Sequence, residues 1–328
     1  MSQEKTNFLE RSKTFWNPGK TQDWQDMGID LVIDHREKYY LHDMDGRRLI
    51  DVHLNGGTYN LGHRHPELVE VLKAGTSRFD MGNHHFPALA RTALAEALAE
   101  SAPGPELRYT AYGSGGGEAI DIALKTARHA TQRRKIVSII KAYHGHTGLA
   151  VKTGDDRFSK LFLSEDTVGE FVQVPFNDLN TMEDALKRRD VAAVIMETIP
   201  ATYGFPMPEE GYLPSVKQLC ERYDTLYIAD EVQTGLMRTG ELWGCTKYKV
   251  QPDIMVTGKG ISGGMYPIAC VLISEKCSGW LKEDGFAHMS TMGGAELGCV
   301  VAMKTLEIVQ RPEVRSVVHF ISDYIRSG

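Results

Sequence analysis

Several features that mark common protein classes are absent from the sequence. No apolar stretch approaches the roughly 20 residues needed to cross a bilayer, and the opening segment, MSQEKTNFLERSKTFW, has no apolar core of a secretory signal. The net charge of −6 comes with no long basic run, which disfavours binding to nucleic acid or anionic membranes. The five cysteines are an odd number and form no CxxC pair, as expected for reduced thiols. We therefore expect a cytoplasmic protein.

Common catalytic motifs are also absent or out of context. No G-x-S-x-G elbow supports a serine hydrolase. GKGISG at 258–263 has the letters of a dinucleotide fingerprint, but a strand-like run follows it where a helix is required. PGKT at 18–21 ends like a P-loop, yet Thr14 stands where the first glycine belongs, which disfavours an ATPase. Histidine pairs at 63/65, 84/85 and 144/146 have no cysteine or carboxylate at metal-ligand spacing, so no metal site is expected.

The 328 residues are enough for one large domain or two smaller ones, and two kinds of patterning divide them. From about residue 106 onward, apolar β-rich runs alternate with helical patterns. The runs are LRYTAY, KIVSII, VAAVIMET, TLYIAD, DIMVTG and IACVLIS. They predict an α/β fold with a mostly parallel central sheet and helices on both faces. Residues 30–60 instead predict short antiparallel strands that turn at Asp45-Gly46.

Polar residues collect where the predicted strands end. They are Ser114, Tyr143, His144, Glu197, Asp230 and Lys259. In open α/β sheets, ligands bind in the crevice beyond the carboxyl ends of the strands. The strand ends therefore predict a single site.

GSGGGEAIDIALKTAR, residues 113–128, places a glycine run between a strand and a helix. Glycines 115–117 let backbone N–H groups approach an anion, and the helix N-terminus favours negative charge there. A glycine-rich structural turn is the alternative interpretation. The run is not a dinucleotide fingerprint, because Glu118 stands where the last glycine is needed.

A lysine, a carboxylate and an anion cradle at strand ends suit pyridoxal 5′-phosphate. This cofactor needs an amine for its aldehyde, a carboxylate that keeps its pyridine nitrogen protonated, and a phosphate site. Lys259 fits the first need, Asp230, 29 positions earlier, fits the second, and the 114–117 loop fits the third. Each feature alone is commonplace, but their combination in this order is specific.

These residues resemble the class III (omega-type) aminotransferases from about residue 30 onward. The segments that carry the resemblance are DGRRLIDV, NLGHRHPELVE, YGSGGGEAIDIALKTAR, YHGHT, IADEVQTGLMRTG, PDIMVTGKGISGG and HMSTMGG. The resemblance implies the fold-type I architecture of pyridoxal-phosphate enzymes. We expect an N-terminal segment and small antiparallel subdomain in 1–60, a large cofactor-binding domain in 61–310, and the start of a further helix or small domain in 311–328.

Residue roles are implied by the same resemblance. Lys259 would form a Schiff base with the cofactor and move a proton between the donor Cα and C4′, while Asp230 pairs with the pyridine nitrogen. Tyr143 and Val232 would sandwich the ring, and Gln233 would reach its 3′-oxygen. The remaining expected contacts are Ser114, Gly115, Gly116 and Gly117 on the phosphate, Glu197 in the pocket lining, and Thr291 on the phosphate of a neighbouring subunit. The last contact implies a homodimer with shared active sites.

The resemblance implies ping-pong transamination between a small-molecule donor and a carbonyl acceptor, with two departures from the family pattern. Thr202 stands where ornithine-type relatives have a glutamate, so that carboxylate gate is not carried over. The chain also stops before the family's C-terminal small domain and its substrate arginine. We expect the apolar stripe of PEVRSVVHFISDYIRSG to be left exposed as a consequence. An aminomutase or racemase, and a non-catalytic fragment that binds the cofactor, are the alternatives.

Overall fold

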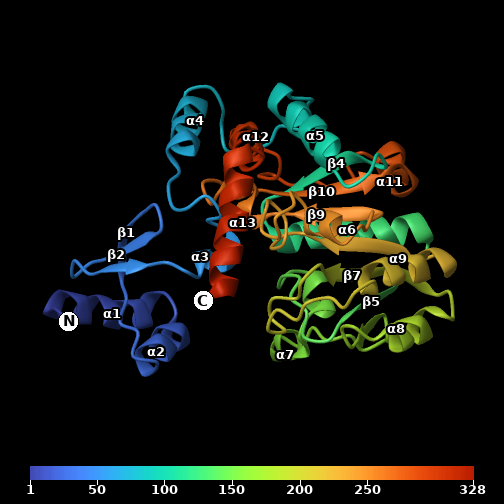
Figure 1. Cartoon of the computed structure of the whole chain (residues 1–328), viewed down its shortest axis with the longest axis horizontal. Coiled ribbons are helices and arrows are strands. Elements are labelled where there is room, and N and C mark those ends of the chain that lie inside the picture. Colours follow the sequence, from blue (N-terminus) through green and yellow to red (C-terminus); the bar gives the residue numbers. More distant parts are fainter.

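A seven-stranded sheet forms the centre of the computed structural model, which describes residues 1–328 (Figure 1). Its strands lie in the order β4-β10-β9-β8-β7-β5-β6. They are β4 (Leu107–Gly113), β5 (Lys135–Ile139), β6 (Phe171–Val174), β7 (Val191–Glu197), β8 (Leu226–Asp230), β9 (Ile254–Thr257) and β10 (Ala269–Ser274). Strands β9, β8, β7, β5 and β6 pair in parallel, and β10 runs antiparallel to both β4 and β9. The prediction of a mostly parallel sheet is confirmed.

Helices bury both faces of this sheet. One face packs on α6 (Gly116–Thr131) and α11 (Gly279–Glu283). The other face packs on α5 (Leu89–Ser101), α8 (Leu179–Leu186), α9 (Tyr212–Arg222) and α12 (Glu296–Val309). Side chains of β7 divide between these two cores, because neighbouring residues of a strand point to opposite faces. Burial on both faces explains why the strands read as unbroken apolar runs.

The N-terminal part is built separately from the large sheet and lies beside it (Figure 1). It contains α1 (Gln3–Phe15), α2 (Pro18–Asp26), and an antiparallel sheet of β1 (Ile33–Glu37), β2 (Tyr40–Asp43) and β3 (Arg48–Ile50). Gly46 supplies the positive φ of +82° at the turn between β2 and β3. The predicted hairpin at Asp45-Gly46 is confirmed, while domain boundaries at 60 and 310 stay predictions.

Shorter elements connect these parts. They are α3 (Leu54–Gly57), α4 (Pro66–Thr76), α7 (Asp156–Leu161) and α10 (Gly244–Lys247), with single 3₁₀ turns at Ala150–Thr153, Lys259–Ser262 and Glu275–Cys277. None of the helices combines the length and the apolar character needed to cross a membrane.

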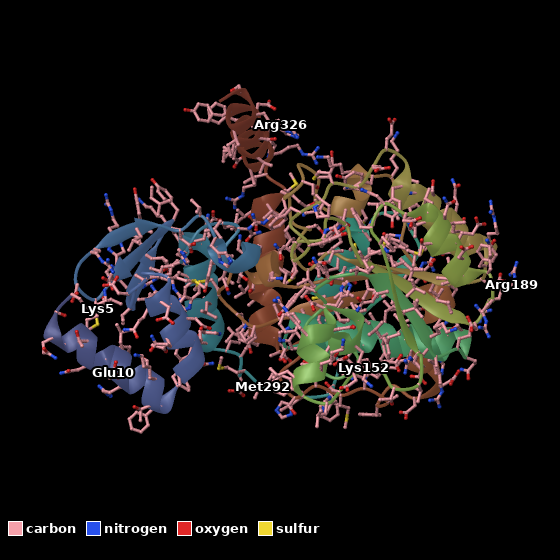
Figure 2. The ribbon with its side chains drawn as sticks, turned by 90° about the horizontal axis from the view of Figure 1, so that it is seen from below. Lys5, Glu10, Lys152, Arg189, Met292 and Arg326 are labelled. Atoms are coloured by element: carbon pink, nitrogen blue, oxygen red, sulfur yellow. The ribbon has the colours of Figure 1, made fainter.

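The last helix, α13 (Pro312–Ser327), projects from the body near Arg326 in Figure 2. Val314 and Val318 pack against the core. Val317, Ile321, Tyr324 and Ile325 of the predicted apolar stripe are at least half exposed, as is Phe320. The stripe therefore has only one edge covered in this chain.

A buried lysine ties α1 to the N-terminal sheet. Lys5 is fully buried, and its Nζ lies 2.7 Å from Oδ2 of Asp43, which is equally buried. Asp30 lies 3.5 Å away, and Arg47 donates to the same Asp43 oxygen at 2.9 Å. Burial alone would raise the pKa of Asp43, but these cations and the Val32 N–H lower it to about 2. The cluster thus ties α1 to the N-terminal sheet through buried charge, in addition to the buried side chain of Leu9.

We predict that Lys5→Met destabilises the protein by about 3 kcal/mol at pH 7, because it leaves a buried carboxylate with one partner fewer. A carboxyl group whose pKa is lowered in the folded protein stabilises the fold at pH values above its ordinary pKa. This contribution is lost as the pH falls through the folded-state pKa. The deficit should therefore shrink as pH falls from about 4 to 2. Urea unfolding followed by tryptophan fluorescence measures the free energy of unfolding of both proteins at each pH.

Lys13→Met on the same helix is the control. Lys13 pairs with the exposed Glu10 at 3.1 Å, so its loss should cost no more than about 0.5 kcal/mol. Equal effects of the two substitutions would contradict the role given to Lys5.

Candidate active site

The predicted site residues converge on one small pocket at the carboxyl ends of β5, β7, β8 and β9. The pocket has a volume of about 170 Å³. Its lining is Gly116, Gly117, Tyr143, His144, Gly145, Glu197, Asp230, Val232, Gln233 and Lys259. Most residues predicted from the sequence are among them. Ser114, Gly115 and Thr291 are not. Gly145 is an addition, and His144 was predicted at the site only by its place at a strand end.

Asp230 ends β8 and is fixed by hydrogen bonds on both carboxylate oxygens. Oδ2 lies 2.7 Å from Nδ1 of His144, and Oδ1 accepts the Val232 N–H at 3.0 Å. Both side chains are buried. Burial alone would lower the pKa of His144, but its hydrogen bond to Asp230 and the charge of that carboxylate raise it. The sequence placed His144 at a strand end without assigning it a partner.

Glu197 ends the neighbouring strand β7 and is also buried. Its carboxylate accepts the Tyr143 N–H at 3.2 Å and the Ala201 N–H at 3.4 Å. Burial raises the pKa of Glu197 to about 7, although the nearby His144 opposes the shift. The pocket thus holds two carboxyl groups, Glu197 and Asp230. The positive charge of the His144 imidazole interacts favourably with both of them.

Lys259 follows β9 and points its amine into the pocket. Nζ lies 3.2 Å from Oε1 of Gln233 and 5.9 Å from the centre of the Tyr143 ring. Its backbone has a φ of +42°, which is uncommon for a residue with a side chain and typical of functional sites. A Cβ on Gly260 would lie 2.9 Å from Nδ2 of Asn60, so a larger residue next to Lys259 would have to displace the Asn60 side chain.

The glycine run forms the wall opposite Lys259, at the N-terminus of α6. Gly115 is the N-cap, and Gly116 and Gly117 form the first turn. A Cβ on Gly117 would lie 2.8 Å from Oγ1 of Thr147, and one on Gly116 would lie 3.3 Å from Val232. Side chains here would fill the cradle, while the backbone N–H groups of a 16-residue helix favour an anion.

Ser114 turns away from this cradle. Its backbone N–H and its hydroxyl both donate to Oε2 of Glu118 at 2.7 Å. Only the four-residue spacing of Ser114 and Glu118 could have indicated this pairing from the sequence.

Thr291 lies in the segment between α11 and α12, outside the pocket. It is exposed, next to the surface residue Met292 labelled in Figure 2. Its carbonyl accepts the Asn83 N–H at 2.6 Å. The structure of one chain thus leaves the Thr291 side chain free to meet another molecule.

A larger cavity of about 480 Å³ lies at the opposite end of β8, β9 and β10 and contains no predicted site residue. Asp253 in its wall binds Lys217 at 2.9 Å and Lys276 at 2.6 Å. Its other oxygen accepts the Tyr227 N–H at 2.7 Å. Lys217, Lys276, Glu221 and Asp253 of this cavity are paired with one another, and none of the predicted site residues lies there.

We predict that His144 remains an imidazolium above pH 6.5, the usual midpoint of histidine. In Asp230→Asn the favourable charge is lost while burial remains, so the pKa of His144 should fall below that value. A histidine whose pKa is raised in the folded protein stabilises the fold below pH 6.5. This contribution is lost as the pH rises through its folded-state pKa. Nitrogen NMR of ¹⁵N-histidine-labelled protein measures the titration, with His144→Gln assigning the signal.

Asp121→Asn is the matched control, because Asp121 binds Thr147 and Ala150 at 2.8 Å nearby. It should leave the His144 titration in place. A His144 midpoint at or below 6.5 in the unaltered protein would contradict the assignment.

Comparison with known proteins assigns the family. Residues 21–328 match the family described as aminotransferase class-III. An uncharacterized aminotransferase of Archaeoglobus fulgidus is 48% identical over 307 residues, which are 94% of this chain and 72% of that protein.

Solved structures agree with the fold. Ornithine aminotransferase from Toxoplasma gondii ME49 superposes with a TM-score of 0.84 at 26% identity. The superposition covers 95% of this chain and 73% of the ornithine aminotransferase chain. Taurine:2-oxoglutarate aminotransferase from Bifidobacterium kashiwanohense, in complex with PLP and glutamate, superposes at 0.82 with 27% identity, covering 90% and 72%. The lysine, the buried aspartate and the glycine cradle fit pyridoxal 5′-phosphate. The chain belongs to the class III aminotransferase family and is a pyridoxal-phosphate-dependent aminotransferase of fold-type I.

Proposed function

We propose that the chain moves an amino group from an amine or amino-acid donor to a 2-oxo acid or aldehyde by a ping-pong mechanism. In this proposal Lys259 forms a Schiff base with the cofactor. The observation that carries it is the convergence of Lys259, Asp230 and the glycine cradle on one pocket. When bound, the cofactor supplies an aldehyde that condenses with amines and a protonated ring that accepts electrons from the substrate carbon.

The pocket walls provide a place for each part of the cofactor. Gly116 and Gly117 would bind the phosphate at the N-terminus of α6. Tyr143 and Val232 would cover the two ring faces, and Gln233 would reach the 3′-oxygen. Ser114 and Gly115 belong to the same loop. Because Glu118 accepts both donors of Ser114, we propose that Ser114 shapes the loop and that the glycines make the closest contact.

Asp230 would hold a proton on the pyridine nitrogen. A carboxylate does this only if it stays ionised in a buried setting, where desolvation favours its neutral form. The imidazolium of His144 and the Val232 N–H supply the opposing stabilisation. Glu197, with a pKa of about 7, can lie beside this pair without adding a full second negative charge.

Lys259 would also move the proton of the reaction. Its Nζ would take a proton from the donor Cα and return it at C4′. The hydrogen bond to Gln233 keeps the amine on the side of the pocket that faces Tyr143. Because the lysine side chain has four rotatable bonds and stands next to Gly258 and Gly260, it can leave and re-enter this position.

We also propose a cytoplasmic homodimer in which Thr291 reaches the phosphate of the neighbouring subunit. The exposed position of Thr291, apart from its own chain's pocket, supports this sharing. All five cysteines are buried and unpaired, as is usual in a reducing compartment.

The first test maps the Schiff base. Protein purified with the cofactor should show imine absorbance, and borohydride reduction should fix the pyridoxyl group to Lys259. Lys259→Ala should abolish this labelling and lower turnover by several orders of magnitude, because both the imine and the proton acceptor are lost. Peptide mass mapping of the reduced protein gives the position.

Lys125→Ala is the control, because Lys125 binds His288 at 2.9 Å near the cradle but outside the pocket. A pyridoxyl group on any other lysine would overturn the assignment. A donor-plus-acceptor assay then separates transamination from isomerisation, since an aminomutase or racemase would turn over one substrate with no 2-oxo acid.

The second test concerns the shared site. Thr291→Ala should weaken cofactor retention, and mixing it with Lys259→Ala subunits should restore activity. One site of the mixed dimer then combines both defects, and the other has neither. Activity is compared with the two parent dimers after mass spectrometry has verified that heterodimers form. Activity no higher than the sum of the parents would argue against sharing.

A further inference from the structure

The larger cavity, at the amino ends of β8 and β9, is separate from the pocket. Its volume of about 480 Å³ is in the range of small-molecule sites. Asp253 lines it just before β9, whereas Lys259 lines the pocket just after β9. The four residues of β9 between them span roughly 13 Å. Residues of α9 also line the cavity, and Figure 1 shows α9 at the side of the sheet away from the N-terminal part.

The buried part of the cavity wall has its charges paired. Asp253 is buried and binds Lys217 at 2.9 Å and Lys276 at 2.6 Å. Lys217 also binds Glu221 at 3.2 Å. Ser274 ends β10 in the same wall, and its buried hydroxyl has no nitrogen or oxygen partner in the chain. This part of the wall therefore offers an unused hydroxyl but no unpaired charge.

Two other charges of the wall have no ion-pair partner in the chain. They are Lys249, in the turn after α10, and Glu106, just before β4, and both are exposed. The complete wall holds three lysines and three carboxylates, so its formal net charge is zero. A multiply charged anion such as a phosphate would find no excess of cations here. One unpaired cation and one unpaired carboxylate instead match the two charges of a zwitterion.

The rest of the wall is polar and uncharged. Gln218 and Gln251 contribute amides, which both donate and accept hydrogen bonds. A Cβ on Gly104 would lie 2.8 Å from Cδ of Gln251, so this amide rests against bare backbone. Apart from the rings of three prolines, no apolar side chain lines the cavity. The wall thus suits a hydrophilic ligand.

We propose that this cavity binds a free amino acid with an uncharged polar side chain. The α-carboxylate pairs with Lys249 and the α-ammonium with Glu106, through hydrogen bonds that charge makes stronger than neutral ones. The ligand's side chain meets the amides of Gln218 and Gln251. The inference does not rest on the proposed transamination, because none of the proposed cofactor contacts lines the cavity.

The test compares L-glutamine with two analogues that each lack one charge. Glutaramate is glutamine without its α-amine, and 4-aminobutanamide is glutamine without its α-carboxylate. The holoenzyme is first reduced with borohydride, so that added amines cannot form an imine at Lys259. Ligand-observed NMR titration then gives the three dissociation constants. Glutamine should bind about 10-fold more tightly than either analogue, because each analogue loses one charge-assisted pair.

Two variants assign the charges of the ligand. Lys249→Met should raise the dissociation constant of glutamine about 10-fold and leave that of 4-aminobutanamide, which has no carboxylate, unchanged. Glu106→Gln should weaken glutamine binding by the same factor and leave glutaramate, which has no amine, unchanged. Lys247→Met is the control, because Lys247 donates to the Thr239 carbonyl at 3.1 Å and does not line the cavity. It should leave all three constants in place.

Thermal unfolding provides a second readout. A ligand that binds only the folded protein raises Tm as its concentration increases. The same rise should need about 10-fold more glutamine in Lys249→Met and in Glu106→Gln than in the unaltered protein. Because both residues are exposed, the two variants should unfold at the unaltered Tm when no ligand is present.

The outcomes are distinct from those that test transamination. The amino-acid site would be overturned if glutamine did not bind the reduced holoenzyme, or bound it no more tightly than the two analogues. Unchanged glutamine binding in either variant would also overturn it. Absence of a pyridoxyl group on Lys259 would overturn the proposed Schiff base alone, and the same titrations in untreated protein would then decide the cavity.

Discussion

Burial of both faces of the central sheet is the constraint on which the site depends. Charged groups cannot lie within β7, β8 or β9 without losing their solvation, so they occur where these strands end. Parallel pairing then brings Glu197 beside Asp230 in register. Two carboxyl groups at adjacent strand ends repel each other when both are ionised, and the structure resolves this with the imidazole of His144 and a raised pKa for Glu197.

Close backbone approach is the second requirement, and it accounts for the glycines around the pocket. A Cβ on Gly145 would lie 2.6 Å from Cα of Gly117, and the cradle would close. A Cβ on Gly57 would displace the guanidinium of Arg238. These glycines do not make the chain flexible at the site. They allow loops from β4, β5 and the N-terminal part to approach one another more closely than side chains permit.

The sequence was sufficient to predict six of the seven strands of the sheet and most of the residues that line the pocket, because strand ends and motif spacing are local properties. The edge strand β6 (Phe171–Val174) was not among the predicted runs. Lys259, Asp230 and the glycine run could be placed in this way. The pairing of Asp230 with His144 spans 86 positions, and only folding reveals it. The hydrogen bonds from Ser114 to Glu118, and the left-handed turn at residues 54–57, depend on backbone angles that letters do not specify.

One buried carboxylate organises the loop that follows β8. Glu231 accepts the N–H groups of Gly244 at 2.6 Å and Cys245 at 2.9 Å, and the hydroxyl of Thr198 also donates to it. Burial raises its pKa, and these donors oppose the rise. Both ends of the loop are thereby tied together. Because Asp230, Val232 and Gln233 lie at or within this closed loop, the same anchor helps to set the positions of three proposed cofactor contacts. Glu231 itself is not in the pocket lining and needs no contact with the cofactor to do so.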